Sequence, residues 1–416
     1  MTADTTSEID PQAVKAKWTV MVFMGAATIE GNEPLIDAAE ADLAEMQFVG
    51  SGPALDDETG ERRGDLEIIV QVHQGKHVAP RRGRITREKK ARIDTLEEVP
   101  EHLRDTADGW ALLNFINWAL EEAKHGKDDR TLLVLWGHAY DFAIGRAHTR
   151  GGTIDSLDFA ELSRVLKTLQ QKFGVGRKLD ILGCDACDLA TVEMACQLKP
   201  FASYLLCSQI GIPIPGWPYD RVLYRLRHPN GAIMNPAELG TWTVRRFCET
   251  YSAESRTVSL TLLDLTRAEE LFEAAAVLAL ALASTIGDVS ARDRIAYLFS
   301  QSQTGPGKPY VDVADLCLNL VRNSGDTLVI EAARDLGNFL LAPQLELVGT
   351  RGTRRAFVIE HGRNTCETAR LNGISIYAPN VAPHRDFDAV QHMYHNFDFA
   401  QQTRWSGLVH ALARSR

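Results

Sequence analysis

Short apolar runs rich in strand-forming residues alternate with longer amphipathic stretches through the first two hundred residues, and this alternation constrains the fold most. The apolar runs lie at 18–24, 66–72, 131–136, 178–183 and 203–207, and the amphipathic stretches at 33–48, 107–124, 157–173 and 189–199. Strands separated by helices are typical of a mostly parallel sheet with helices on both faces. The pattern therefore predicts an α/β fold, in which ligands bind outside the carboxyl ends of the strands.

The character of the chain changes after residue 265. An alanine-rich helical stretch at 266–284 is followed by helical stretches at 290–300, 312–322 and 327–341, and by strand-like runs at 355–360 and 373–378. We therefore expect a flexible leader at 1–16, a main domain at 17–265, and a smaller C-terminal α+β unit at 266–416.

Composition excludes several classes of protein. The 416 residues carry a formal charge of −10, which argues against a nucleic-acid binder with its basic face. One basic run, residues 81–92, is expected to be a solvated hairpin or loop, with a docking patch for an acidic partner as the alternative.

The chain also has no obvious membrane or export signal. Its longest notable apolar run, 274–283, has ten residues where a bilayer needs about 20. The first 18 residues are polar and acidic and do not resemble a signal peptide. We expect a cytoplasmic protein with no membrane partner.

Chemically useful side chains follow three neighbouring strands of the predicted sheet. His138 follows the run at 131–136, Asp185 and Cys187 follow the run at 178–183, and Gln209 follows the run at 203–207. A cysteine nucleophile must be a thiolate, which a nearby imidazole or a helix N-terminus can stabilise. We expect a helix to begin near Leu189, just after Cys187. A catalytic Cys–His pair and a structural thiol beside a core histidine both fit this pattern.

Seven scattered cysteines are expected to be reduced, and most of them buried. Cys184 and Cys187 form a CxxC pair, which leaves a thiol oxidoreductase open as a further alternative. With no second CxxC and no matching histidine pair, we predict no zinc site.

Several segments together resemble the clostripain family of cysteine peptidases, which have a caspase-like fold. The most specific are Leu133-Val-Leu-Trp-Gly-His138 and Leu179-Asp-Ile-Leu-Gly-Cys-Asp-Ala-Cys187. Weaker matches are 18–23, 42–46, 215–219, 263–265, 373–379 and 399–405. The resemblance implies a caspase-like, mostly parallel sheet flanked by helices. It implies a cysteine endopeptidase in which Cys187 is the nucleophile and His138 its partner.

The resemblance also implies roles around this dyad. The backbone N–H groups of Cys187 and Ala139 would polarise the scissile carbonyl. Asp185 would line the S1 pocket and select substrates cleaved after Arg or Lys, with a helix N-cap as its alternative role. Gln209 stands where the family often has an acidic residue. Trp217 either shapes the substrate cleft or packs beneath it. We expect all three to serve substrate binding.

Family members are often activated by cleavage between the His and Cys strands. Here the loop 139–156 offers Arg150 and, as a second choice, Arg146. An upstream protease is the alternative activator. The sequence requires no cofactor, and calcium is possible by resemblance only. We therefore expect a regulated intracellular protease that acts on protein substrates, with a non-catalytic adaptor or inhibitor of the same fold as the alternative.

Overall fold

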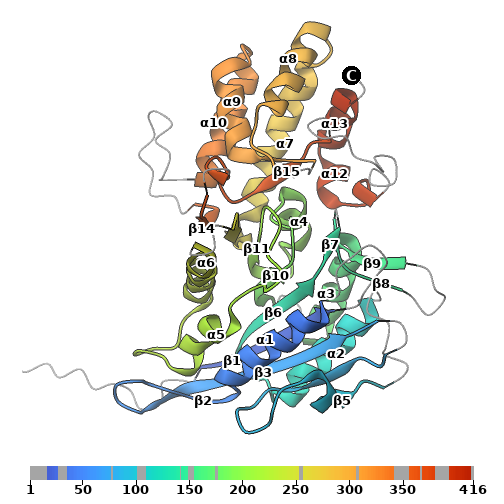
Figure 1. Cartoon of the computed structure of the whole chain (residues 1–416). Coiled ribbons are helices and arrows are strands. Elements are labelled where there is room, and N and C mark those ends of the chain that lie inside the picture. Colours follow the sequence, from blue (N-terminus) through green and yellow to red (C-terminus); the bar gives the residue numbers. More distant parts are fainter. Residues whose placement is uncertain are drawn as a thin grey trace, which may run out of the picture.

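A computed structural model of the chain describes residues 16–26, 35–75, 78–100, 109–140, 142–148, 154–173, 177–252, 256–305, 309–341, 356–365, 368–379 and 393–413. Within these ranges ten strands form one sheet, shown in Figure 1, in the order β14-β12-β11-β10-β6-β1-β3-β4-β5, with β2 paired to β3. The five strands from β11 to β3 run parallel, and the strands outside them pair antiparallel.

The ten strands of this sheet are β1 (Ala16–Gly25), β2 (Gly52–Leu55), β3 (Arg62–His73), β4 (Arg81–Arg84), β5 (Glu97–Glu98), β6 (Arg130–Gly137), β10 (Leu179–Asp185), β11 (Ala202–Cys207), β12 (Ser259–Asp264) and β14 (Val358–Arg363). A second sheet joins β7 (Ala139–Tyr140), β8 (Ala143–His148) and β9 (Ile154–Asp158), and a third joins β13 (Tyr310–Asp312) and β15 (Ser375–Tyr377).

Helices surround the main sheet. They are α1 (Ile36–Val49), α2 (Gly109–Glu122), α3 (Phe159–Phe173), α4 (Val192–Leu198), α5 (Tyr219–Arg227), α6 (Pro236–Ser252), α7 (Ala268–Thr285), α8 (Val289–Ser300), α9 (Val313–Asn323), α10 (Thr327–Leu341), α12 (Asp398–Gln402) and α13 (Trp405–Ala413), with 3-10 turns η1 (Ile93–Thr95) and η3 (Leu265–Arg267). The helices α7 to α10 stand together at the top of Figure 1.

Both faces of the sheet are buried because successive side chains of a strand point to opposite sides. Val20 and Val22 of β1 pack into a cluster with α1, α5 and α6, whereas Met21 and Phe23 pack into a cluster with α2 and α3. The α/β prediction is therefore confirmed. The predicted strands at 18–24, 66–72, 131–136, 178–183 and 203–207 correspond to β1, β3, β6, β10 and β11.

The basic run at 81–92 begins with β4, the next-to-last strand at one end of the main sheet. The guanidinium groups of Arg82 and Arg84 pair with Glu97 and Glu67, respectively. These intramolecular ion pairs neutralise part of the positive charge of this run.

The C-terminal half is built mainly of helices but also contributes to the main sheet. Strand β14 pairs with β12, and one hydrophobic cluster contains residues of α2, α3 and α4 as well as α7, α9 and α10. The predicted boundary at residue 265 stays a prediction. None of the described helices is long and apolar enough to cross a membrane.

A buried carboxyl group joins the main sheet's helices to the C-terminal segment. Glu193 of α4 has no exposed surface, and its Oε1 accepts hydrogen bonds from the Tyr377 N–H at 3.1 Å and the Tyr394 hydroxyl at 3.0 Å. Burial raises the pKa of Glu193 from 4.5 to about 7. The folded protein therefore holds this proton more tightly than the unfolded chain does.

Replacement of Glu193 by Gln is expected to weaken the pH dependence of stability. The wild-type carboxyl favours folding fully below pH 4.5, and this contribution is lost as the pH rises through about 7, with a total of roughly 3 kcal/mol. The fall in Tm between pH 5 and pH 8.5 should therefore be smaller in Glu193→Gln than in the wild type. The control is Glu273→Gln on the exposed side of α7, which should follow the wild type. Equal Tm shifts in all three proteins would contradict the assignment.

Candidate active site

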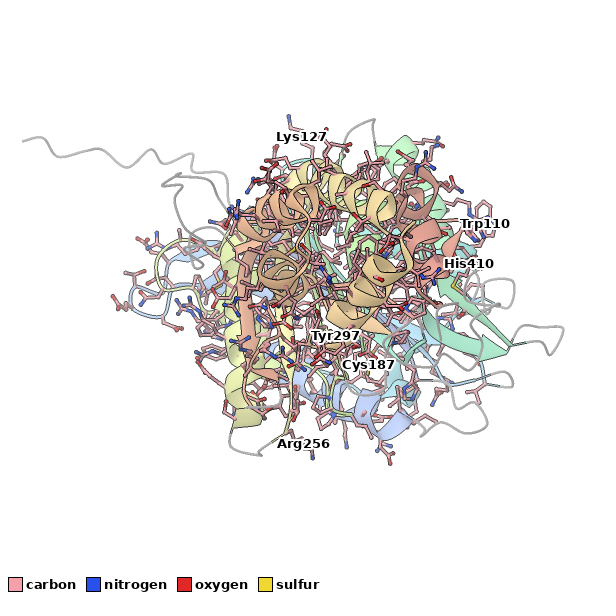
Figure 2. The ribbon with its side chains drawn as sticks, turned by 90° about the horizontal axis from the view of Figure 1, so that it is seen from above. Trp110, Lys127, Cys187, Arg256, Tyr297 and His410 are labelled. Carbon is pink, nitrogen blue, oxygen red and sulfur yellow. The ribbon has the colours of Figure 1, made fainter. Side chains whose placement is uncertain are left out.

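Two neighbouring parallel strands bring the candidate dyad to one edge of the sheet. Trp136 of β6 pairs in register with Asp185 of β10, and His138 and Cys187 each lie two residues further along. Both side chains line one small cleft of about 50 Å³. In the view from above, Cys187 lies inward of Trp110 and Lys127, which are at the margin (Figure 2). The prediction that these residues meet at the carboxyl edge is confirmed for His138, Asp185 and Cys187.

The turn that delivers His138 depends on glycine. Gly137 ends β6 with a φ of 139°, in the region that side-chain-bearing residues rarely adopt. A Cβ at this position would lie 2.8 Å from the carbonyl oxygen of Gly25 on β1. Only glycine allows the chain to turn here while β6 remains close to β1.

The environment of Cys187 differs from the predicted one. Helix α4 begins at Val192, where the Thr191 side chain accepts a hydrogen bond from the Met194 N–H, and not near Leu189. The predicted start of the helix is therefore wrong, and stabilisation of the thiolate by α4 stays a prediction. The described hydrogen-bond donor to Cys187 Sγ is the backbone N–H of Ile212, at 3.2 Å.

The segment 208–212 that supplies this N–H is fixed to the cysteine loop by backbone hydrogen bonds. The Asp188 N–H donates to the Ile210 carbonyl at 3.2 Å, and the Ala190 N–H donates to the Ser208 carbonyl at 2.9 Å. Asp188 has a φ of 58°, a left-handed conformation that aspartate tolerates better than most residues. The sharp turn after Cys187 and the donor to its sulfur thus belong to one hydrogen-bonded unit.

Asp185 forms the floor of the cleft. Its Oδ2 accepts hydrogen bonds from the Trp217 N–H at 3.0 Å and the Tyr219 hydroxyl at 3.1 Å, while its buried Oδ1 has no hydrogen-bond partner among the described residues. Burial raises the pKa of Asp185 to about 7, against the two hydrogen bonds, which lower it. Because Thr191 is the cap of α4, the alternative role of Asp185 as the helix N-cap is wrong.

Two further acids of α1 lie close to Asp185. The Trp136 indole N–H donates to Asp42 Oδ2 at 2.7 Å, and the Tyr219 N–H donates to Glu45 Oε2 at 2.8 Å. Burial raises the pKa of Glu45 to about 7 and raises the pKa of Asp42 well above its ordinary value. Sequence reasoning assigned neither acid a role, although both lie in the matching segment 42–46.

The structure corrects the substrate-binding role predicted for Gln209. Its side chain is buried; its Nε2 donates to Asp312 Oδ2 and Ser375 Oγ, both at 3.0 Å, and its Oε1 accepts from the Gly373 N–H at 2.6 Å. All of its hydrogen-bonding groups are used within the protein, so none of them faces the cleft.

Trp217 follows the second of its two predicted roles. Its side chain has no exposed surface, and a Cβ added at Gly183 would lie only 2.7 Å from its ring. The ring packs against β10 beneath the cleft. The predicted contact of this ring with substrate is therefore wrong. The Trp217 backbone N–H donates to Asp185 Oδ2 and so helps to hold this side chain at the cleft.

Of the other predicted site residues, Ala139 and Arg146 belong to the second sheet. Ala139 begins β7 and pairs with Ile144 of β8. Among the described residues, Lys124 and Asp188 are the non-glycine positions with positive φ, so Ala139 has an ordinary backbone conformation. Its oxyanion role stays a prediction. Arg146 lies in β8, and Arg150 lies outside the described residues.

Metal and redox chemistry find little support among the described residues. They contain no group of three or more His, Cys, Asp or Glu side chains able to hold a metal ion. The described residues therefore offer no ligand set for calcium. Cys184 is fully buried, and burial raises the pKa of its thiol. The CxxC pair consequently lacks a second accessible thiol.

Comparison with known proteins agrees with this geometry. A family model described as the clostripain family, peptidase C11, matches residues 32–407. A search of curated proteins found no match.

Two solved structures are similar to this chain. The structure of a secreted C11 cysteine protease from Bacteroides thetaiotaomicron, in complex with an irreversible peptide inhibitor, has a TM-score of 0.59 at 17% identity, and the match covers 95% of this chain and 99% of that chain. An inactive zymogen C11 protease from Parabacteroides distasonis has a TM-score of 0.61 at 15% identity, covering 94% and 98%. At these identities the two structures support the fold alone.

Cys187 is expected to react faster with iodoacetamide at pH 7 than Cys248 does, by about tenfold or more. The two cysteines are matched because both are half-buried. Cys187 Sγ accepts a hydrogen bond from the Ile212 N–H, which favours its thiolate. In contrast, burial and the nearby Glu360 and Glu249 raise the pKa of Cys248 to about 12. Peptide mapping by mass spectrometry measures both rates in one sample. Equal rates would contradict an activated thiol at position 187.

Proposed function

The chain belongs to the clostripain family of cysteine peptidases, and from this premise we propose that it cleaves polypeptides after Arg or Lys with a Cys187–His138 dyad. The observation that carries the proposal is the shared cleft at the ends of β6 and β10. The Ile212 N–H that reaches Cys187 Sγ supports the nucleophilic role, because a donor to sulfur favours the thiolate.

The proposed reaction has two halves. The Cys187 thiolate attacks the scissile carbonyl carbon, and the Cys187 and Ala139 N–H groups bind the oxyanion that forms. His138 then gives a proton to the leaving amine as the C–N bond breaks, which leaves a thioester. A water molecule, deprotonated by His138, attacks the thioester; the C–S bond breaks, the carboxylic acid leaves, and the Cys187 thiolate beside protonated His138 is regenerated.

Asp185 supports the preference for a basic P1 side chain. Asp185 lines the cleft beside Cys187, and its Oδ1 is buried and without a partner among the described residues. A guanidinium placed there completes the hydrogen bonding of the carboxylate and supplies the missing positive charge.

The experiment that tests the proposal is turnover of fluorogenic peptides with P1 Arg, Lys, Asp or Leu, with and without calcium. Arg and Lys peptides should be cleaved. Cys187→Ala should reduce kcat by more than about a thousandfold, and His138→Ala by about a hundredfold or more. Equal turnover in Cys187→Ala and wild type would reject the nucleophile. An enzyme that binds but cleaves none of the peptides, even after limited trypsin treatment, would favour the non-catalytic adaptor.

The preference for P1 Arg is expected to strengthen as the pH rises through about 7. Because the raised pKa of Asp185 keeps its carboxyl partly protonated at neutral pH, alkaline conditions create the anion that pairs with the guanidinium. The measurement is the ratio of kcat/KM for Arg and citrulline peptides between pH 5.5 and 8.5, in which the titration of the dyad cancels. Asp185→Asn should lower the ratio about tenfold or more and make it flat. A flat ratio in the wild type would reject the S1 role.

Activation by cleavage in the loop 139–156 is the second part of the proposal, with an upstream protease as the alternative cutter. Intact mass of the purified protein should show cleavage after Arg150, or less often after Arg146, that is absent in Cys187→Ala. Arg150→Gln should block the main cut, and Arg146→Gln serves as the matched control. A single 46.0 kDa species with full peptidase activity would contradict activation by processing.

We place the enzyme in the cytoplasm, where it would act on protein substrates. The six described cysteines are free thiols, as a reducing compartment favours. The solved relative from Bacteroides thetaiotaomicron is described as secreted, which makes cell fractionation the direct test of this location.

A further inference from the structure

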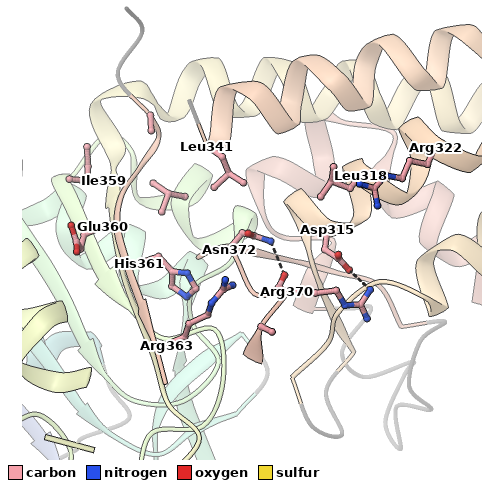
Figure 3. Close-up of a pocket in the computed structure, with 13 residues that line it drawn as sticks. Asp315, Leu318, Arg322, Leu341, Ile359, Glu360, His361, Arg363, Arg370 and Asn372 are labelled. Atoms are coloured by element: carbon pink, nitrogen blue, oxygen red, sulfur yellow. Dashed lines mark hydrogen bonds and ion pairs between the residues drawn. The ribbon is translucent and has the colours of Figure 1, made fainter. Parts of the chain in front are cut away.

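A second cavity lies away from the dyad, in the C-terminal half of the chain. It has a volume of about 440 Å³, within the range of small-molecule sites and far larger than the cleft at Cys187. Figure 3 shows that its walls come from α9, the end of α10, β14 and the segment 369–372. None of the residues proposed for catalysis lines it.

The charged side chains of this cavity are mainly cationic. Arg322, Arg363 and Arg370 line it together with the acids Asp315 and Glu360. Both acids are already engaged: Asp315 pairs with Arg370 at 3.2 Å, and Glu360 pairs with Arg245 at 3.2 Å. Because Arg370 is the partner of Asp315, Arg322 and Arg363, both exposed, remain as the lining guanidinium groups without an ion pair among the described residues.

The histidine in this cavity does not add to the charge. His361 Nε2 shares a hydrogen bond with Ser259 Oγ at 3.2 Å. Burial and the neighbouring Arg363 lower the pKa of His361 to about 3. Because its imidazole is neutral at physiological pH, the positive charge comes from arginines and does not vary with pH.

One side of the cavity is held by a buried network. The Asn372 N–H and Nδ2 donate to the two oxygens of Asp312, at 2.6 and 2.9 Å, and the Asp315 N–H donates to Asp312 Oδ1 at 2.8 Å. Asp312 is fully buried. A ligand would therefore meet a preformed wall, which lowers the ordering cost of binding.

We propose that this cavity binds a small organic anion, whose charged head lies on the arginines and whose apolar body packs against Leu318, Leu341 and Val358. Arginine presents a planar set of donors that matches carboxylate and phosphate groups. The three aliphatic side chains line the same cavity and give the ligand an apolar contact. Carboxylate and phosphate ligands share this chemistry, and the proposal is independent of the peptidase activity.

Isothermal titration calorimetry of the full chain tests this proposal with phenyl phosphate, benzoate and inorganic phosphate as probes. Phenyl phosphate or benzoate should bind with a stoichiometry near one and weaken as NaCl is raised. Inorganic phosphate should bind at least tenfold more weakly than phenyl phosphate, because it lacks the apolar body. No saturable heat with either aromatic probe up to about 10 mM, or equal affinity for phosphate and phenyl phosphate, would overturn the proposal.

Three arginine variants locate the site. Arg363→Gln should weaken phenyl phosphate binding at least tenfold. Because Arg363 also donates to the Leu371 carbonyl, the exposed Arg322→Glu provides a second variant that adds a negative charge with little risk to folding. Arg404→Gln, an exposed arginine before α13, is the matched control and should bind as the wild type does. Wild-type affinity in both cavity variants, or equal loss in the control, would overturn the assignment.

Discussion

The in-register pairing of β6 with β10 is the constraint on which the active site depends. Two parallel strands that bury both faces cannot slip by one residue without moving every core side chain to the wrong side of the sheet. Trp136 opposite Asp185 therefore fixes His138 and Cys187 at the same level beyond the sheet. The packed core therefore sets the positions of His138 and Cys187. The chain makes one sharp turn beside each of them, at Gly137 and at Asp188.

The second constraint is the burial of negative charge beneath the cleft. Asp42, Glu45 and Asp185 come from two elements; Asp42 accepts a hydrogen bond from Trp136, and Glu45 and Asp185 both accept hydrogen bonds from Tyr219. Burial raises the pKa of all three carboxyls, so these groups are partly protonated at neutral pH and carry less than their full negative charge. A cationic side chain stabilises the ionised state of such a cluster, whereas an acidic one adds to the repulsion. The proposed preference for a basic P1 residue agrees with this electrostatic environment.

The sequence allowed prediction of the parallel strands, because each combines a run of strand-forming residues with a following amphipathic helix. It also placed His138 and Cys187 at one edge, since the carboxyl ends of parallel strands lie together. It did not reveal the donor to Cys187, because a backbone N–H such as that of Ile212 leaves no trace in residue identity. The start of α4 was misplaced because Leu189 and Ala190 are apolar residues of a loop that is itself buried. Trp217 could not be assigned from its neighbours, since proline and glycine predict a turn without saying which side of it is covered.

Gln209 shows how the two halves of the chain depend on each other. Its amide donates to Asp312, which caps α9, and accepts from the Gly373 N–H beside β15. A carboxylate at this position could accept but could not donate, and it would face the Asp312 carboxylate within a buried site. The glutamine is therefore the residue that the C-terminal half requires at the end of β11. The segment 208–212 also supplies the Ile212 N–H that donates to Cys187 Sγ. Two hydrogen bonds, from Gln209 to Asp312 and from Ile212 to Cys187, therefore link α9 to the sulfur of the proposed nucleophile along this segment, so packing of the C-terminal half supports the position of Cys187.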